Sequence, residues 1–388
     1  MSRSKLGRRD FLQMSALAAG VASRGFAREP SHQRDSGNAS RQTESSARTD
    51  YKDSDLSRIA FPLGGIGAGM ICLEGTGALT HFSLHNRPDL NNEPLILGAV
   101  SVKGQHEGFA RVLEGPVPDW KLFPGGQGVT GLSPYGGLPR FTRASFKSRF
   151  PFATVSLADE HIPLSVEVMG WSPFEPGDAD SASLPVAGLE YTFANPLPEG
   201  LEAVFSFNVG NFLDSLDRGG FFVNATSQSK IESLPGGFLL RRLSSDPAQQ
   251  NEASFAAWTD EPAACVNLAW YRGGWFDSFS MLWRDIQQGA CYQRPDSNSA
   301  HTPRGATLFV PFKLGARQAK TIKVGLAWYS PHSDLRTPGG NNQELVKDGP
   351  TYRPWYSGKF PDIHSLVAHW RDSYSPLKQG TKRFTDCL

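Results

Sequence analysis

The chain has 388 residues, which is enough for one large domain or two ordinary ones. Its 39 Lys and Arg residues balance its 38 Asp and Glu residues, which gives a formal charge of +1. This balance gives no reason to expect a nucleic acid or an anionic membrane as partner, and it is compatible with a neutral ligand such as a sugar. The four cysteines form no C-x-x-C pair, so neither a zinc ribbon nor a thioredoxin-like site is predicted, whereas one or two disulfides remain open.

The first 27 residues have the features of a twin-arginine signal peptide. The segment GRRDFLQ at 7–13 is followed by a short apolar run at 14–22 and by small residues near Ala27. The apolar run is about half as long as a bilayer span requires. We therefore expect export by the twin-arginine route to the periplasm or the extracellular space, and a mature chain without a membrane span.

Residues 28–54 contain almost no large apolar side chains. Such a segment cannot bury enough surface to offset the entropy lost on ordering, so we predict a flexible linker. A folded body is predicted over 55–333, and a connector with a helix over 334–388.

The body reads as a succession of strands. Short apolar runs rich in β-branched and aromatic residues recur between turn signals. Strands are predicted at 95–102, 153–157, 164–168, 186–193, 201–209, 237–243, 264–271, 307–314 and 321–329. The last two are predicted to form a hairpin. We therefore expect an all-β fold, a large antiparallel two-sheet β-sandwich.

After residue 333 the sequence becomes rich in Gly, Asn and Pro, and residues 363–374 then have the first clear helical pattern. Ile363, Leu366, Val367 and Trp370 share one face, and Asp362 is suited to cap the helix. That apolar face needs a partner to pack against, and too few residues follow the helix to form one. The helix is therefore predicted to link the sandwich to a further domain.

The most conspicuous segment is FPLGGIGAGM at 61–70. Its glycines could suggest a phosphate-binding loop, but no Lys-Ser or Lys-Thr follows and residues 70–73 resemble a strand. A tight backbone crossing, where glycine permits positive φ or close approach, is favoured.

This segment, continued by THFSLHNRP at 80–88, resembles the opening of glycoside hydrolase family 116, which includes the non-lysosomal glucosylceramidase and bacterial β-glucosidases. Further blocks agree with that family in the same order. They are GWSPFEPGD at 170–178, SLPV at 183–186, YTFAN at 191–195 and WYSGKF at 355–360. The resemblance runs from about residue 56 to the end of the chain.

The resemblance implies an N-terminal β-sandwich followed by an (α/α)6 helical toroid that holds the nucleophile and the acid for hydrolysis of a β-glucoside. The chain is expected to stop at the threshold of that toroid, so the toroid is missing and no catalytic residue, metal or cofactor is assigned. The expected function is that of the N-terminal domain of a β-glycosidase. It would lack catalysis by itself and depend on a helical catalytic domain or partner chain.

Two aromatic clusters are candidates for contact with a sugar or with the absent domain, because aromatic faces cover the apolar faces of pyranose rings. The candidate residues are Trp270, Tyr271, Arg272 and Trp275 in the first cluster and Trp355 and Tyr356 in the second. Tryptophan in a sandwich more often belongs to a core or a domain interface. An exported carbohydrate-binding or accessory module remains the alternative function.

A third possibility is a site within the sandwich itself. The acidic pairs Asp178 with Asp180 and Asp214 with Asp217 are near in sequence, but turn-forming and solvated roles suit acidic residues in loops better. His81 and His85 have a spacing that could hold a metal on a helix, but here the segment resembles strand and loop. Packing or hydrogen bonding is the favoured role for both histidines.

Overall fold

A computed structural model describes residues 50–85, 88–90, 92–104, 109–122, 137–213, 229–242, 252–271, 278–295, 304–332 and 353–388. The predicted signal peptide lies outside these residues, as does most of the predicted linker. The described part of that linker contains β1 (Asp50–Lys52), which pairs with β7 (Arg143–Arg149), and the first residues of the 3-10 helix η1 (Asp53–Arg58).

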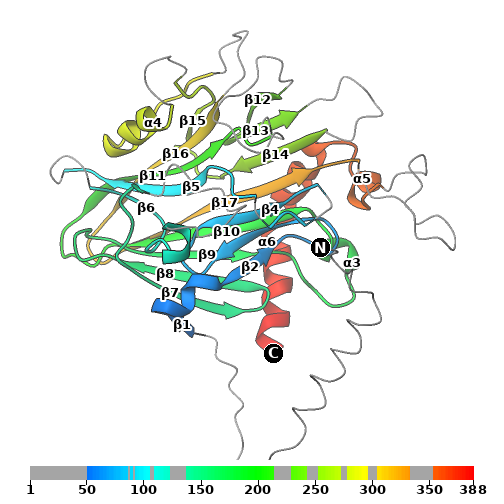
Figure 1. Cartoon of the computed structure of the whole chain (residues 1–388), viewed down its shortest axis with the longest axis horizontal. Helices are drawn as coiled ribbons and strands as arrows, with labels where there is room; N and C mark the ends of the chain where they lie inside the picture. The colour runs from blue at the N-terminus through cyan, green and yellow to red at the C-terminus, as the bar shows by residue number, and fades with distance from the viewer. Residues whose placement is uncertain are drawn as a thin grey trace, which may run out of the picture. The chain divides into compact units, whose positions relative to one another are not determined.

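The larger of two main sheets has nine strands, and each pairs antiparallel with its neighbours (Figure 1). In spatial order they are β1, β7 (Arg143–Arg149), β8 (Phe152–Ala158), β9 (Ser165–Trp171), β10 (Val186–Ala194), β17 (Ala319–Tyr329), β14 (Ala253–Trp258), β13 (Gly237–Arg242) and β12 (Ser229–Leu234).

The second sheet has five strands, also antiparallel. Their order is β15 (Cys265–Asn267), β16 (Gly305–Leu314), β11 (Leu201–Gly210), β5 (Ile96–Val102) and β6 (Ala110–Val112). A small third sheet contains β2 (Ala60–Leu63), β3 (Met70–Glu74) and β4 (Leu79–Ser83). The predicted all-β sandwich is confirmed, with this three-stranded sheet as an addition.

The main core lies between the two large sheets and follows from the period-two alternation of their strands. On β10, Leu189, Tyr191 and Phe193 are buried and belong to one cluster with residues from the facing sheet. The ring of Tyr191 lies 4.7 Å from that of Phe205, and the ring of Phe193 lies 4.9 Å from that of Phe312. Interdigitated aromatic rings therefore join the two sheets.

The predicted hairpin of 307–314 with 321–329 is wrong. The corresponding strands, β16 and β17, are consecutive but belong to different sheets. Each is already paired on both edges, β16 with β11 and β15, and β17 with β10 and β14. The short connection at 315–318 therefore crosses from one layer to the other, and both strands direct apolar side chains into the same core.

Besides η1, the described residues form five α-helices, and two of these are long enough to cover a sheet. The short ones are α2 (Asp119–Leu122), α3 (Ala179–Ala182) and α5 (Tyr356–Lys359), and the long ones are α4 (Ser278–Gln287) and α6 (Ile363–Cys387). Figure 1 shows α4 beside the five-stranded sheet and α6 against the nine-stranded sheet. Among the described residues, no helix combines the length and the apolar character needed to cross a bilayer.

The helix predicted at 363–374 is confirmed at its start and extends further at its end. Asp362 forms a capping box with Ser365, whose backbone nitrogen lies 2.8 Å from the Asp362 carboxylate. The helix continues through Pro376 to Cys387. Its apolar face does not need a further domain as partner, because it packs back on the nine-stranded sheet.

Candidate functional site

The glycine segment forms the predicted tight crossing. Gly64, Gly67 and Gly69 have positive φ angles of 132°, 71° and 83°. The amide of Gly65 donates to the Leu184 carbonyl at 2.9 Å, and a Cβ on Gly65 would lie 2.5 Å from that backbone. The segment at 61–70 and the segment at 183–186 are therefore in direct backbone contact, where a larger residue does not fit.

The outer face of the nine-stranded sheet carries two buried tryptophans whose indoles occupy the space above glycines. A Cβ on Gly188 would come within 2.3 Å of the Trp171 indole, and a Cβ on Gly325 would come within 2.3 Å of the Trp258 indole. Each glycine is the cross-strand partner of the tryptophan that covers it. These four residues, here called the tryptophan cradle, leave a smooth aromatic surface for α6.

Helix α6 rests on the tryptophan cradle through its own aromatic residues. The Trp370 ring lies 5.4 Å from the Trp171 ring, and the Tyr374 ring lies 5.0 Å from the Trp171 ring and 6.2 Å from the Trp258 ring. Trp171, Trp258 and Trp370 are fully buried. This packing holds the connector against the sandwich with a large burial of apolar surface.

A buried polar network fixes the position of α6. The Trp171 indole donates to the Tyr374 hydroxyl at 3.1 Å, and that hydroxyl donates to the Glu190 carboxylate at 3.0 Å. The Lys378 ammonium lies 2.7 and 2.6 Å from the two oxygens of Glu190. Burial and the Glu190 charge raise the pKa of Tyr374, which keeps it protonated as a donor.

The second half of α6 follows the segment at 170–178. The backbone nitrogen of Phe174 donates to the Thr381 hydroxyl at 3.0 Å, and the Thr385 hydroxyl donates to the Phe150 carbonyl at 3.1 Å. A Cβ on Gly380 would lie 2.4 Å from the Glu175 carboxylate. The helix is thus in contact with the sandwich along most of its length.

The second predicted aromatic cluster lies just before α6. Tyr356 is buried, and its hydroxyl donates to the Ser330 carbonyl at 2.9 Å. Trp355 is 45% exposed, with the Lys359 ammonium 5.0 Å from its ring centroid. Of these two candidates, Trp355 offers an accessible aromatic face and Tyr356 anchors the connector.

The first predicted aromatic cluster is only partly described. Trp270 is 3% exposed, lies over Gly305, and donates to the Thr307 hydroxyl at 2.9 Å. Tyr271 is 39% exposed. Arg272 and Trp275 lie outside the described residues. The burial of Trp270 matches the packing role that tryptophan commonly has in a sandwich.

The candidate acidic pair at Asp178 and Asp180 has local roles. Asp178 caps α3 by accepting from the Ser181 backbone at 3.0 Å, and Asp180 pairs with Lys359 at 3.2 Å. Both findings agree with the turn-forming role favoured from the sequence. Asp214 and Asp217 lie outside the described residues.

The buried carboxylates among the described residues are all paired with a cation, at distances of 2.6 to 3.0 Å. The pairs are Glu74 with Lys121, Glu114 with Arg140, Asp159 with Arg111, and Glu190 with Lys378. A general acid and a nucleophile need two carboxyl groups that face a common substrate. In each of the four buried pairs the carboxylate is the counter-ion of a lysine or arginine.

One cluster has the residue types of a metal site. Ligand atoms of Glu74, His81 and Glu93 lie within 4.8 Å of one another. The ammonium of Lys121 lies 2.6 Å from Glu74 and 3.1 Å from Glu93, and these carboxylates raise the pKa of Lys121 although burial lowers it. The lysine thus supplies the positive charge between the two carboxylates.

The two candidate histidines are separated by the fold. His81 has a φ of 53°, and its Nδ1 lies 2.5 Å from the Leu90 carbonyl. His85 instead lies with its Nδ1 3.1 Å from the Ser330 hydroxyl. Each ring has its own hydrogen-bond partner, as the favoured interpretation of the sequence expected.

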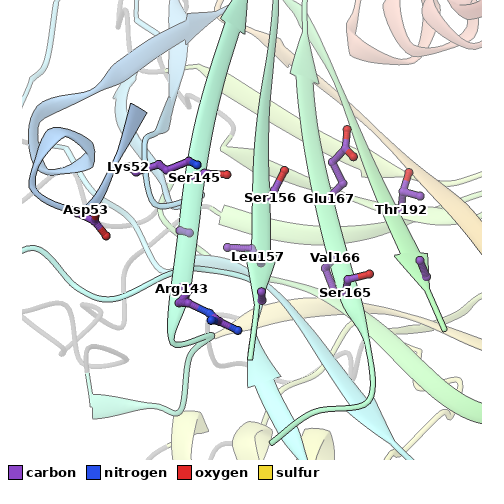
Figure 2. Close-up of a pocket in the computed structure, with 13 residues that line it drawn as sticks. Lys52, Asp53, Arg143, Ser145, Ser156, Leu157, Ser165, Val166, Glu167 and Thr192 are labelled. Atoms are coloured by element: carbon purple, nitrogen blue, oxygen red, sulfur yellow. The ribbon is translucent and has the colours of Figure 1, made fainter. Parts of the chain in front are cut away.

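A shallow hollow lies on the uncovered part of the nine-stranded sheet (Figure 2). Its floor includes Ser145, Ser156, Glu167 and Thr192, which are opposite one another on β7, β8, β9 and β10. Lys52 and Asp53 lie along its edge. None of the described residues that line it is aromatic.

The family of the chain follows from a match of its sequence to a family profile. Residues 60–377 match the family profile described as "beta-glucosidase 2, glycosyl-hydrolase family 116 N-term". The chain belongs to glycoside hydrolase family 116. It is a glycosidase-like N-terminal domain. Of the blocks that indicated the family, 61–70 and 183–186 meet at the glycine crossing, and 170–178 contacts α6. A comparison with curated proteins found no match.

Several solved structures are similar at low identity. A human-microbiome protein described as a kojibiose phosphorylase shares 8% identity with a TM-score of 0.41 over 87% of this chain and 37% of its own. A family GH92 α-mannosidase from Bacteroides thetaiotaomicron shares 12% identity with a TM-score of 0.31 over 84% of this chain and 34% of its own. Slr1438 from Synechocystis shares 9% identity with a TM-score of 0.35, over 70% and 96% of the two chains. The family assignment rests on the sequence match alone.

The polar network under α6 cannot be predicted from the helical pattern at 363–374. That pattern predicts a helix that ends at Tyr374, so Lys378 falls outside it. One signal is present in the sequence. Trp370, Tyr374 and Lys378 are four residues apart, so they share one face of a helix. Glu190 carried no such signal, because its partners are 184 and 188 positions away.

Proposed function

We propose that this domain is the structural base of an exported β-glucosidase-like enzyme of family 116, and that α6 connects it to an (α/α)6 catalytic domain. The observation that carries the proposal is the docking of α6 by the tryptophan cradle and by Glu190. A connector held along its length fixes the direction in which a following domain leaves the sandwich, and accurate placement of catalytic groups depends on such rigid support.

Hydrolysis of the β-glucoside is assigned to the helical domain, in the same chain or in a partner chain. The pairing of the buried carboxylates with cations supports this assignment, because each described buried acid already has a structural role. The domain alone is therefore expected to lack β-glucosidase activity.

The test is hydrolysis of a chromogenic β-glucoside by the purified chain, alone and mixed with a separately expressed helical domain from a family 116 relative. We expect activity that depends on the mixture and exceeds that of the helical domain alone. Turnover by this chain alone would overturn the proposal, as would a helical domain whose rate is unchanged by the sandwich. Trp370→Ala, which weakens the docking of α6, should reduce the gain in the mixture.

Export by the twin-arginine pathway belongs to the same proposal. Its support is the segment at 7–13 together with the apolar run at 14–22. We assign residues 1–27 to the signal peptide and a periplasmic or extracellular location to the mature chain. Replacement of both Arg8 and Arg9 by Lys should leave the uncleaved chain in the cytoplasm, as measured by fractionation and N-terminal mass. Normal cleavage and export of that variant would contradict the assignment.

An exported carbohydrate-binding or accessory module is the second candidate, and the exposed ring of Trp355 is the observation that favours it. Titration of the isolated chain with a soluble β-glucan, followed by calorimetry, tests this function. Binding that Trp355→Ala abolishes and Tyr271→Ala preserves would support a sugar site at the connector. No heat of binding at millimolar sugar would remove this candidate.

A further inference from the structure

The segment between β15 and β16 is an excursion that closes on itself. The chain leaves the five-stranded sheet after Asn267, forms α4, and returns at 291–294 beside its starting point. The amide of Leu268 donates to the Arg294 carbonyl at 2.9 Å, and the amide of Arg294 donates to the Val266 carbonyl at 3.0 Å. The two ends of the excursion are thus held side by side by backbone hydrogen bonds.

Two cysteines occupy these ends. Cys265 is the first residue of β15, and Cys291 lies in the returning segment, with the two Sγ atoms 2.9 Å apart. This separation is shorter than an ordinary non-bonded contact between sulfur atoms. Both residues are partly exposed, so a small oxidant can reach them. The backbone pairing brings the sulfur atoms together independently of any bond between them.

We propose that Cys265 and Cys291 form a disulfide that closes the excursion carrying Trp270, Tyr271 and α4. Two thiols lose two protons and two electrons as the Sγ–Sγ bond forms. The electrons pass to a disulfide oxidant, such as oxidised glutathione, which is reduced to two thiols. A cysteine thiolate first attacks the oxidant to give a mixed disulfide, and the second cysteine then displaces the remaining thiol.

The contact between the two sulfur atoms favours the second step of this exchange. Burial and the adjacent Cys265 raise the pKa of Cys291 to about 12, so the exchange is expected to be faster at alkaline pH, where more thiolate is present. Whichever cysteine attacks the oxidant first, the other can displace the remaining thiol, because the two sulfur atoms are already 2.9 Å apart.

The link would hold a small apolar cluster on the outer face of the five-stranded sheet. Leu282 and Ile286 of α4 pack with Trp270 against Leu97 and Ala99. Because α4 has only ten residues, this burial is modest. A cross-link at the base of the excursion limits the separation of its ends when the cluster opens, and so favours the docked helix.

The first test is peptide mapping of the purified full chain after exposure to oxidised glutathione, with free thiols alkylated before digestion. Trypsin separates the two cysteines into the peptides 243–272 and 285–304, since Arg294 precedes a proline. We expect one cross-linked species that contains both peptides and disappears on reduction. Recovery of both peptides fully alkylated would overturn the inference, as would a link of either one to Cys72 or Cys387.

Matched variants test the assignment and its consequence. Cys387→Ser should keep the cross-linked species, whereas Cys265→Ser and Cys291→Ser should each lose it. In the unmodified chain, oxidation should raise the Tm by several degrees over the reduced protein. Cys387→Ser should retain that shift and Cys265→Ser should lack it. An equal Tm for the linked and reduced chains would show that the link does not stabilise the excursion. The comparison of the oxidised and reduced forms of the unmodified chain remains valid even where a serine variant folds poorly.

Discussion

Helices α4 and α6 each cover the outer face of one sheet, but they are held in different ways. Helix α4 buries a few apolar side chains in a cluster supplied largely by neighbouring strands and by its own excursion. Helix α6 combines three buried tryptophans with a polar network whose partners are up to 188 positions apart. The difference indicates that the connector is an integral layer of the sandwich, whereas α4 is a local attachment.

The largest effect is expected from the aromatic packing of α6. Trp370→Ala removes a fully buried indole that contacts Trp171 and Tyr374, and should lower the free energy of unfolding by about 3–5 kcal/mol in urea denaturation. Trp355→Ala removes an exposed ring and serves as the control, with a change of about 0.5 kcal/mol or less. Equal effects of the two substitutions would show that α6 is not part of the cooperative core.

The second prediction concerns the buried ion pair. Glu190→Gln leaves the Lys378 ammonium without its counter-ion, and should cost about 1–3 kcal/mol because the lysine side chain keeps 29% exposure. The control is Glu202→Gln, which removes the exposed pair with Lys313 and should leave stability unchanged.

A double-mutant cycle isolates the interaction. Adding Lys378→Met to Glu190→Gln should recover part of the loss, because the uncompensated charge is removed with its partner. Additive costs of the two substitutions would contradict a direct coupling through the buried carboxylate.

Helix α4 should respond locally. Leu282→Ala removes a buried side chain from the satellite cluster, and should accelerate amide exchange in residues 278–287 by destabilising the docked helix by about 2 kcal/mol. Arg284→Ala, on the exposed side of the helix, is the matched control. If Leu282→Ala instead accelerates exchange uniformly across both sheets, α4 belongs to the global core and the contrast with α6 fails.

The smallest effect is a pH dependence at α6. Burial and the nearby Lys359 lower the folded-state pKa of His369 from its usual value of about 6.5. The unfolded chain then binds the proton more readily, so stability is complete above pH ~6.5 and declines as the pH falls toward the folded-state pKa. His369→Gln should reduce the pH dependence of the unfolding free energy between pH 5 and 7. In the unmodified chain, the decline should begin near pH ~6.5. An unchanged profile would exclude this contribution.

Much of the fold followed from local patterns. The alternating strands and the start of α6 after Asp362 depend on near neighbours in sequence and were predictable. The glycines at 61–70 predicted a tight crossing, but not that its partner is the segment at 183–186. The hairpin error at β16 and β17 has a different origin, since a short turn between two apolar strands is compatible with pairing in one sheet or with crossing between two. Only the edge partners of each strand decide between these arrangements, and those partners are distant in sequence.

Helix α4 was missed although its signal was present. Phe279, Leu282, Trp283 and Ile286 have the spacing of an amphipathic helix, but the segment lies within a run of strands. The candidate site was harder to predict, because Trp171 and Trp258 become a cradle only where Gly188 and Gly325 lie beside them on neighbouring strands. Such cross-strand pairs depend on the register of the sheet, which the sequence does not specify by itself.

The tryptophan cradle also gives the protein a built-in optical signal. Trp171, Trp258 and Trp370 are fully buried around Tyr374, with the Trp171 and Trp370 rings 5.4 Å apart and tilted by 53°. Indoles fixed in an asymmetric, water-free setting emit at shorter wavelengths and give strong near-ultraviolet circular dichroism, which disappears when tertiary packing is lost. Loss of the packing between the connector and the sandwich can thus be followed without a label, by emission and by circular dichroism.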